Sequence, residues 1–243
     1  MTDMISPVPI SGISIDWRRI SPESYLRNIP AINGLENLKF HQPITFFVGE
    51  NGSGKSTLLE AIAIAYGFNP EGGTKNYNFS TFDSHSELYQ AIRLFKGPVK
   101  TQWGYFLRAE SFYNVATKEE EYTEEDQSKA KHLHRKSHGE SFLETAQDNF
   151  RPHSLNLIDE PEAALSPQRQ LTMFIEIYRS AQAGAQFIIV THSPILTAIP
   201  GAEILSFDDG LIHPVEYEET GSYQITSMFI NHREQLIRQL LED

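Results

Sequence analysis

Apolar residues along the chain form two kinds of pattern, short continuous runs and longer stretches with helical spacing. The short runs predict strands, which cover residues 13–17, 44–48, 105–108, 155–158 and 187–190. The helical spacing predicts helices, which cover residues 58–65, 87–95, 167–182 and 223–241 and begin once more near residue 140. Because buried strands alternate with helices, we predict an α/β fold with a mainly parallel sheet flanked by helices.

The stretches between these elements indicate the domain organisation. Turn formers are frequent at residues 67–82, and an acidic run followed by a basic run at 118–138 is typical of a surface insertion. We expect one domain, residues 1–243, with a helical and insertion region at about 67–150. Apolar runs at 204–207 and 211–215 predict a β-hairpin. A closing amphipathic helix is expected at 222–242, and its apolar face carries Ile225, Phe229, Leu236 and Leu240.

The composition is that of a globular protein. Of the 243 residues, 40% are hydrophobic and 21% are charged, and no apolar run is long enough to cross a bilayer. Residues 1–15 lack the pattern of a secretion signal, so a cytoplasmic location is expected. The absence of cysteine excludes disulfides and thiolate metal sites.

The net charge of −12 disfavours nucleic-acid binding over the surface as a whole. A basic run between Lys129 and Lys136 could still contact DNA phosphates, although a charge run beside an acidic one is more often a solvated face. A nucleic-acid partner therefore stays open.

The segment at residues 49–57 carries the clearest chemical signal. It reads G-E-N-G-S-G-K-S-T, follows a predicted strand and opens a predicted helix, as a phosphate-binding loop (P-loop) requires. Its glycines let backbone N–H groups point inward, and the helix presents its positive N-terminus to the same anion. The candidate nucleotide-binding residues are Gly49, Glu50, Asn51, Gly52, Ser53, Gly54, Lys55, Ser56 and Thr57.

Three residues of this segment have expected roles. Lys55 would contact the β and γ phosphates of ATP, and the Ser56 hydroxyl would ligate Mg²⁺ that bridges the same groups. Thr57 is expected near the α phosphate.

A second candidate group follows the apolar strand at 155–158. Asp159 and Glu160 end this strand about one hundred residues after Lys55. In P-loop ATPases an aspartate at such a strand end holds the Mg²⁺ shell, and the neighbouring carboxylate orients and deprotonates the attacking water. We assign Asp159 to the metal and Glu160 to the water.

Three further segments resemble those of ABC-type ATPase heads. D-E-P-E-A-A-L-S at 159–166 resembles the Walker B and D-loop segment, V-T-H-S at 190–193 the switch histidine, and S-H-G-E-S at 137–141 the signature. The resemblance implies a P-loop NTPase head with a small helical subdomain that dimerises head to tail around two ATP molecules. It also implies that Ser137 and Gly139 act on the partner's nucleotide, and that His192 contacts the γ phosphate.

The chain also departs from this family. Ser166 replaces the D-loop aspartate, His138 replaces the first signature glycine, and no glutamine lies near Arg108, where Glu110 could stand in. These variants, without long coiled-coil arms, resemble small stand-alone predicted AAA/ABC-like ATPases related to repair and phage-defence ATPases. We expect an ATPase that drives an unidentified effector protein.

Two other functions stay open. One is the ATP-binding subunit of a membrane transporter, with a membrane protein as its partner. The other is a small-molecule kinase, which would leave Glu160, His192 and the signature segment unexplained.

Overall fold

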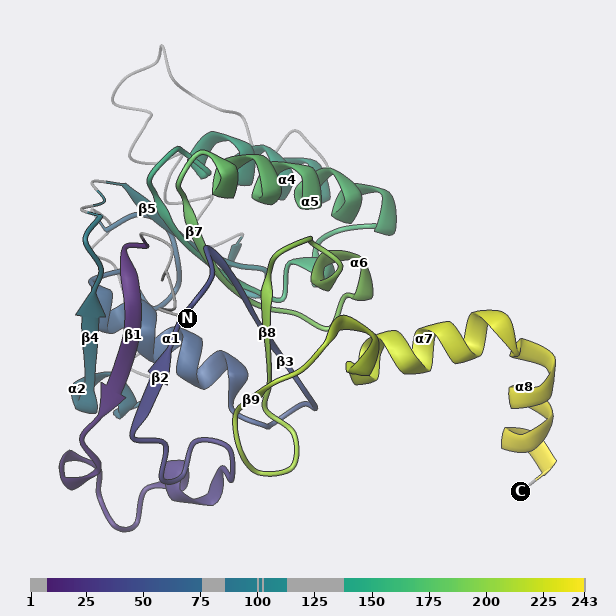
Figure 1. The fold of residues 1–243 in the computed structure, drawn as a ribbon, viewed down its shortest axis with the longest axis horizontal. Coiled ribbons are helices and arrows are strands. Elements are labelled where there is room, and N and C mark those ends of the chain that lie inside the picture. The colour runs from purple at the N-terminus through teal and green to yellow at the C-terminus, as the bar shows by residue number, and fades with distance from the viewer. Residues whose placement is uncertain (1–7, 76–85, 100, 102, 113–137, 243) are drawn as a thin grey trace, which may run out of the picture.

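The computed structural model describes residues 8–75, 86–99, 101, 103–112 and 138–242. Six strands form the main sheet in the order β5-β6-β7-β3-β8-β9 (Figure 1), and all neighbours run parallel except β8 and β9. The strands are β3 (Ile44–Val48), β5 (Gly104–Arg108), β6 (Leu155–Asp159), β7 (Gln186–Val190), β8 (Glu203–Ser206) and β9 (His213–Pro214). Every residue of β3, β6 and β7 is buried, as expected for strands covered on both faces. The predicted parallel sheet is confirmed.

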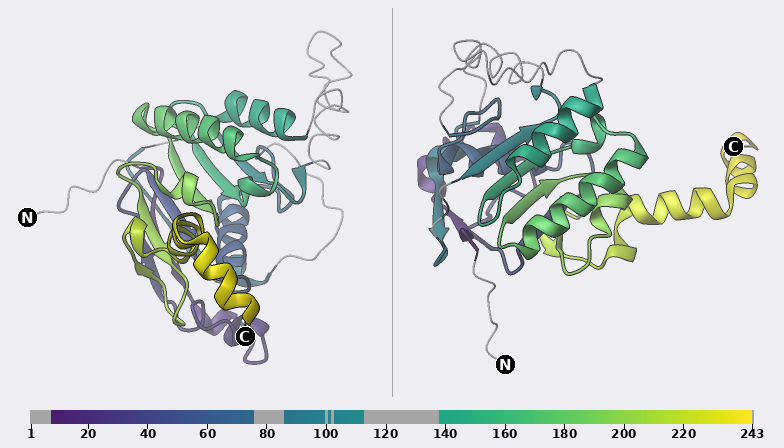
Figure 2. Two further views of the ribbon diagram at one scale, coloured as in Figure 1. Left: turned by 90° about the vertical axis from the view of Figure 1, so that its right-hand side faces the viewer. Right: turned by 90° about the horizontal axis from the view of Figure 1, so that it is seen from above.

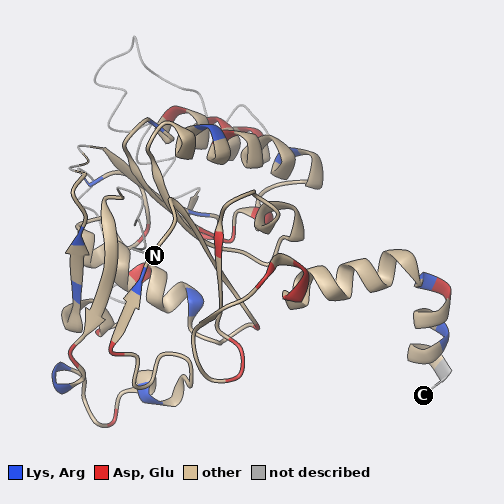
Figure 3. Cartoon of the chain, in the orientation of Figure 1, with Lys and Arg blue, Asp and Glu red and all other residues tan. Residues whose placement is uncertain are grey.

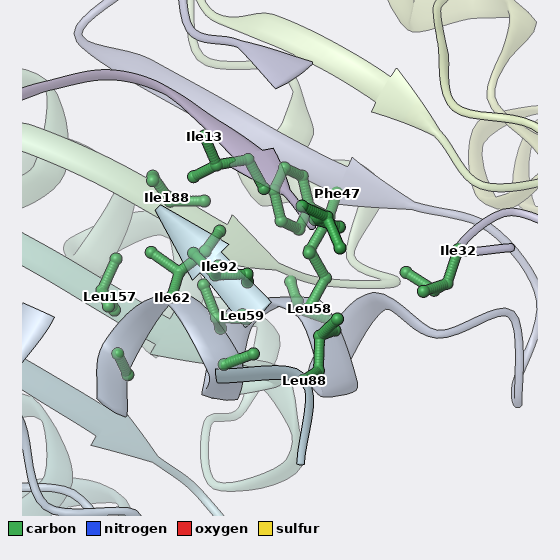
Figure 4. Close-up of a cluster of buried hydrophobic side chains, with 14 of the residues drawn as sticks. Ile13, Ile32, Phe47, Leu58, Leu59, Ile62, Leu88, Ile92, Leu157 and Ile188 are labelled. Carbon is green, nitrogen blue, oxygen red and sulfur yellow. The ribbon is translucent and has the colours of Figure 1, made fainter. Parts of the chain in front are cut away.

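A smaller antiparallel sheet lies on one side of the molecule, in the order β2-β1-β4. It consists of β1 (Ile10–Ile15), β2 (Asn37–Lys39) and β4 (Ile92–Lys96). Helix α1 (Lys55–Tyr66) lies between the two sheets, and one buried cluster joins all three layers. In this cluster Leu59 and Ile62 of α1 are buried together with Ile13 of the small sheet and Ile188 of the main sheet (Figure 4).

The opposite face of the main sheet is covered by α4 (His138–Asn149), α5 (Pro167–Gln182) and α6 (Pro194–Thr197), as Figures 1 and 2 show. Phe142, Met173 and Ile177 are buried there. They share a second core cluster with Ile158 and Ile189 of the sheet. Helix α5 matches its predicted bounds, and α4 begins two residues before the expected start.

Two predictions in the N-terminal half are wrong in detail. The strand expected at 13–17 covers Ile10–Ile15, and a 3₁₀ helix follows at Trp17–Arg19. The helix expected at 87–95 is a single turn, α2 (Leu88–Ala91), followed by β4. β4 pairs antiparallel with β1, from Ile15↔Ile92 to Ile10↔Lys96, so pairing with a distant strand overrides local spacing that suits a helix.

The insertion expected at 118–138 lies outside the described residues, except for His138 at the start of α4. Further 3₁₀ turns cover Tyr25–Asn28, Pro161–Ala163 and Tyr217–Glu219. Among the described residues, no helix has the length and apolar character needed to cross a membrane.

The C-terminal residues form an arm rather than a closing helix. The predicted hairpin is present as β8 and β9, but the helix expected at 223–241 is divided at His232 into α7 (Gly221–Asn231) and α8 (Arg233–Glu242). In Figures 1 and 2 these helices, hereafter the C-terminal arm, extend away from the sheets. The predicted apolar face is therefore largely uncovered: Ile225, Phe229 and Leu240 are 61%, 43% and 68% exposed, and Leu236 is half-buried.

Candidate active site

The P-loop lies between β3 and α1, as predicted. Gly49, Gly52 and Gly54 all have positive φ angles, of 133°, 80° and 99°. A Cβ atom added to Gly54 would also lie 2.7 Å from a side-chain carbon of Ile32, so both the backbone and the space exclude larger residues. In the described part of the chain no side chain caps α1, so the N–H groups of its first turn are free to bind an anion.

The Lys55 side chain lies inside the loop. Its Nζ donates to the carbonyl oxygens of Gly49 and Glu50, each at 2.7 Å, and is 3.4 Å from Ser53 Oγ. Burial lowers the pKa of Lys55, while the nearby carboxylates, Glu160 first, act in the opposite direction. The ammonium group is thus held by the loop at the position where a polyphosphate would bind.

Ser56 and Asp159, the two expected metal residues, are in contact although 103 positions separate them. Ser56 Oγ donates to Asp159 Oδ1 at 2.8 Å. A hydroxyl and a carboxylate provide the hard oxygen ligands that Mg²⁺ prefers, so this pair fits the cation expected with a nucleotide.

The Asp159 carboxylate is almost buried, and its side chain is 9% exposed. Burial raises its pKa above the usual value, although Arg108 and the bond from Ser56 act in the opposite direction. A buried carboxylate favours a nearby cation, because charge neutralisation offsets its desolvation.

Glu160 follows Asp159 with a backbone that side chains rarely adopt. Its φ and ψ angles are 49° and 55°, and its N–H donates to the carbonyl oxygen of Val190 at 3.0 Å. Strained backbone of this kind persists where surrounding contacts hold it and is common at functional sites. Ser56, Arg108, Glu110, Asp159 and Glu160 line one pocket of about 310 Å³.

The structure connects His192 to a carboxylate that the sequence analysis missed. The two oxygens of Glu162 accept bonds from the Thr191 hydroxyl, at 2.7 Å, and from the His192 backbone N–H. Glu162 therefore fixes the end of β7. Among the described residues the buried Nε2 of His192 has no hydrogen-bond partner, which is unusual for a buried nitrogen and leaves this atom available to a ligand.

Asp208 is a second residue that the sequence analysis placed only in a turn. Its Oδ1 accepts a bond of 2.9 Å from the Glu50 N–H, and a Cβ on Gly49 would lie 2.9 Å from the same oxygen. Asp208 thus holds the start of the P-loop from the end of β8.

A second pocket, of about 280 Å³, lies beside the P-loop and extends to the C-terminal arm. Glu50, His192 and Asp208 line it together with Ile225 and other residues near the start of α7. The root of the arm is thus next to the phosphate-binding region.

The expected signature segment is described in part. Ser137 lies outside the described residues, whereas Gly139 lies in the first turn of α4. A Cβ on Gly139 would be 2.8 Å from both the Ala164 carbonyl oxygen and Arg169 Nη1, so the segment packs against the chain that follows Glu160. Ser166, at the expected D-loop position, is the N-cap residue of α5.

A P-loop joined to an acidic strand end within a mainly parallel, helix-flanked sheet defines the class of P-loop NTPases. The expected fold class is thereby confirmed. A model of the AAA domain family matches residues 25–188, more than half of the chain. The chain therefore belongs to the AAA domain family.

One similar solved structure is cbiO1 from Clostridium perfringens, described as part of the ABC transporter complex cbiONQ. It is 14% identical, the match covers 97% of this chain and 100% of that chain, and the TM-score is 0.49. Another is the SMC head domain from Thermotoga maritima, with 15% identity, coverage of 86% and 100%, and a TM-score of 0.47. A third is SmcHead bound to the C-winged helix domain of ScpA, with 15% identity, coverage of 85% and 97%, and a TM-score of 0.47. No curated protein sequence matches the chain.

Proposed function

We propose that this chain binds ATP with Mg²⁺ and hydrolyses it. The observation that carries the proposal is the 2.8 Å bond between Ser56 of the P-loop and Asp159 of β6. It brings a phosphate-binding helix N-terminus and a carboxylate pair to the same edge of the sheet, which is the arrangement that phosphoryl transfer to water requires.

Each side chain of the candidate site has a proposed role that follows from its position. Lys55 neutralises the phosphates as a cation, and the first-turn N–H groups of α1 bind the same oxygens. Bound Mg²⁺ would be held by Ser56 and Asp159 and would supply neutralisation of phosphate charge. Glu160 accepts a proton from the attacking water, since its carboxylate ends the same strand.

His192 would complete the site. With Glu162 bonded to its backbone N–H, its ring is held at the end of β7 beside the pocket that includes Glu50. The unpartnered Nε2 would form a hydrogen bond to the terminal phosphate. The roles of Thr57, Asn51 and Ser53 stay predictions, as contacts of the loop with the nucleotide.

We further propose that two copies close around ATP. Ser137 and Gly139 of one copy would cap the nucleotide of the other, and hydrolysis would open the pair to act on an effector protein. This proposal follows from the resemblance of residues 137–141 to the signature segment of ABC-type ATPase heads. Stimulation of hydrolysis by DNA would favour a role in DNA repair or phage defence, and it is directly measurable.

The test is phosphate release together with nucleotide binding for three variants. Lys55→Ala should weaken ATP affinity by about 100-fold, because charge-assisted bonds to phosphate are lost. Glu160→Gln should keep the affinity and reduce kcat by about 10²- to 10⁴-fold, the usual contribution of a general base.

Glu36→Gln, an equal change at an exposed position of the segment before β2, serves as the control. Its kcat and affinity should match those of the wild type. An equal loss of affinity in Lys55→Ala and Glu160→Gln, or phosphate release that survives both changes, would contradict the assigned roles.

A further inference from the structure

Arg108 connects the expected metal carboxylate to helix α1. It is the last residue of β5 and is paired in register with Asp159, the last residue of β6. Its Nη1 donates to Glu60 Oε2 at 2.7 Å and to the Pro70 carbonyl oxygen at 3.0 Å. Its Nε lies 3.4 Å from Asp159 Oδ2. Its Nη2 also lies 3.9 Å from Oε2 of the exposed Glu110. One guanidinium group is thus within ion-pair distance of three carboxylates, those of Glu60, Glu110 and Asp159.

The contacts with the two buried carboxylates, Glu60 and Asp159, differ in geometry. The bond to Glu60 is short, and both side chains are mostly buried, at 16% and 17% exposed. The contact with Asp159 is an ion pair only, because the buried Nε has no hydrogen-bond partner among the described residues. Arg108 is therefore anchored on Glu60 and could lose Asp159 without losing its main partner.

Both carboxylate oxygens of Asp159 are engaged in this structure. Ser56 donates to Oδ1, and Arg108 lies against Oδ2. Oδ2 is the oxygen that accepts no bond from Ser56, and the guanidinium lies against it. A divalent cation bound by this carboxylate would therefore lie close to the guanidinium. Two cations on one buried carboxylate repel each other, and the repulsion is stronger there than in water.

The other side chains that line the pocket also favour a bound cation. Its described lining carries three carboxylates, of Glu110, Asp159 and Glu160, and a single basic side chain, that of Arg108. Arg108 therefore supplies positive charge to a pocket that is otherwise suited to a cation.

We propose that Arg108 and Mg²⁺ compete for Asp159, so that Arg108 sets the Mg²⁺ concentration at which the nucleotide binds tightly. The inference rests on the proposed function and adds a regulatory element to the same site. Arg108 is a positioning residue: it holds Asp159 in the metal-free protein and stays on Glu60 when the metal binds. Tight binding then requires free Mg²⁺ high enough to displace the guanidinium.

The test measures the affinity for a fluorescent ATP analogue over a series of free Mg²⁺ concentrations. In Arg108→Gln the Mg²⁺ concentration at half-effect should fall by about tenfold, which corresponds to ~1.4 kcal/mol. Affinity measured with a chelator should not improve, because the competitor acts only on the metal. A purely structural role would lower the thermal stability without lowering the Mg²⁺ midpoint.

Removing Arg108 alone leaves Glu60 buried without its partner, which can destabilise the fold. The double variant Glu60→Gln with Arg108→Gln removes both members and should show the same lowered midpoint. Arg18→Gln, an equal loss of charge at a side chain that is 90% exposed, should keep the wild-type midpoint.

The outcomes separate the two proposals. If the wild type binds no nucleotide at any Mg²⁺ concentration, the proposed function is rejected, and so is the competition between Arg108 and Mg²⁺. If the wild type binds in a Mg²⁺-dependent way but the folded Arg108 variants keep or raise its midpoint, the competition alone is overturned.

Discussion

At the scale of single residues, the proposed metal ligand Asp159 carries a cost in stability. Its pKa is raised mainly by burial, so the carboxyl holds its proton to a higher pH in the folded protein than in the unfolded chain. The stability that this group contributes is complete below its ordinary value of 3.8 and is lost as the pH rises through the folded-state pKa. At neutral pH the ionised side chain therefore costs free energy.

Asp159→Asn should accordingly increase the free energy of unfolding at pH 7 in the absence of nucleotide. The gain should shrink as the pH is lowered toward 3.8, because wild-type Asp159 then becomes neutral as well. Denaturant unfolding at several pH values measures both effects. Asp209→Asn, an exposed neighbour of the P-loop anchor, is the control and should show no such gain. A loss of stability in Asp159→Asn that does not vary with pH would contradict the argument.

The same scale shows which site residues a sequence can reveal. Lys55 and Ser56 were predictable because a contiguous loop carries the phosphate chemistry. Glu162, Asp208 and Arg108 were not, because their roles arise from contacts across the fold: Asp208 binds the N–H of Glu50, 158 positions away. The spacing of residues along the chain carries no signal for such a pair.

At the scale of elements, the sequence predicted best where both faces of a strand are covered. β3, β6 and β7 appear as short, largely apolar runs because helices or strands pack on both sides of them. β4 was taken for a helix, because an edge strand with one covered face leaves only a few apolar positions, and these also fit helical spacing. The C-terminal arm was predicted as a helix that closes the domain, and this was wrong. An apolar helix face in the sequence does not show whether the rest of the chain packs against that face.

The exposure of isoleucine side chains in the C-terminal arm can be tested by comparing one exposed and one buried isoleucine. Ile230 in α7 is 71% exposed, whereas Ile188 in β7 is fully buried. Ile188→Ala should cost about 2–5 kcal/mol of unfolding free energy through lost burial and a cavity. Ile230→Ala should change it by less than about 0.5 kcal/mol, as expected of a surface position. Denaturant titration measures both, and similar losses would mean that the arm packs on the body.

At the scale of the whole molecule, the proposed pair of copies can be tested by gel filtration. Glu160→Gln should elute as a monomer alone and as a dimer with ATP, because binding without hydrolysis keeps the closed state populated. Each copy carries a net charge of −12, so the dimer should be favoured by salt that screens this repulsion.

Lys55→Ala serves as the control for that experiment and should stay monomeric at the ATP concentrations that convert Glu160→Gln to a dimer, because its ATP affinity is expected to be about 100-fold weaker. An elution volume of Glu160→Gln that does not change while ATP occupancy is demonstrated would reject the head-to-tail pair.

The length of the C-terminal arm would turn a small rotation at its root into a larger displacement at its end. α7 is uncharged along its whole length (Figure 3), and its root lines a pocket together with Glu50 and His192. With 11 residues in α7, a rotation of about 10° at the root moves its far end by about 3 Å, since a helix rises ~1.5 Å per residue. The chain has no cysteine, so a cysteine introduced at Leu241 would be the single thiol available for labelling. A fluorophore there would convert small rearrangements around the P-loop into displacements that distance measurements can follow.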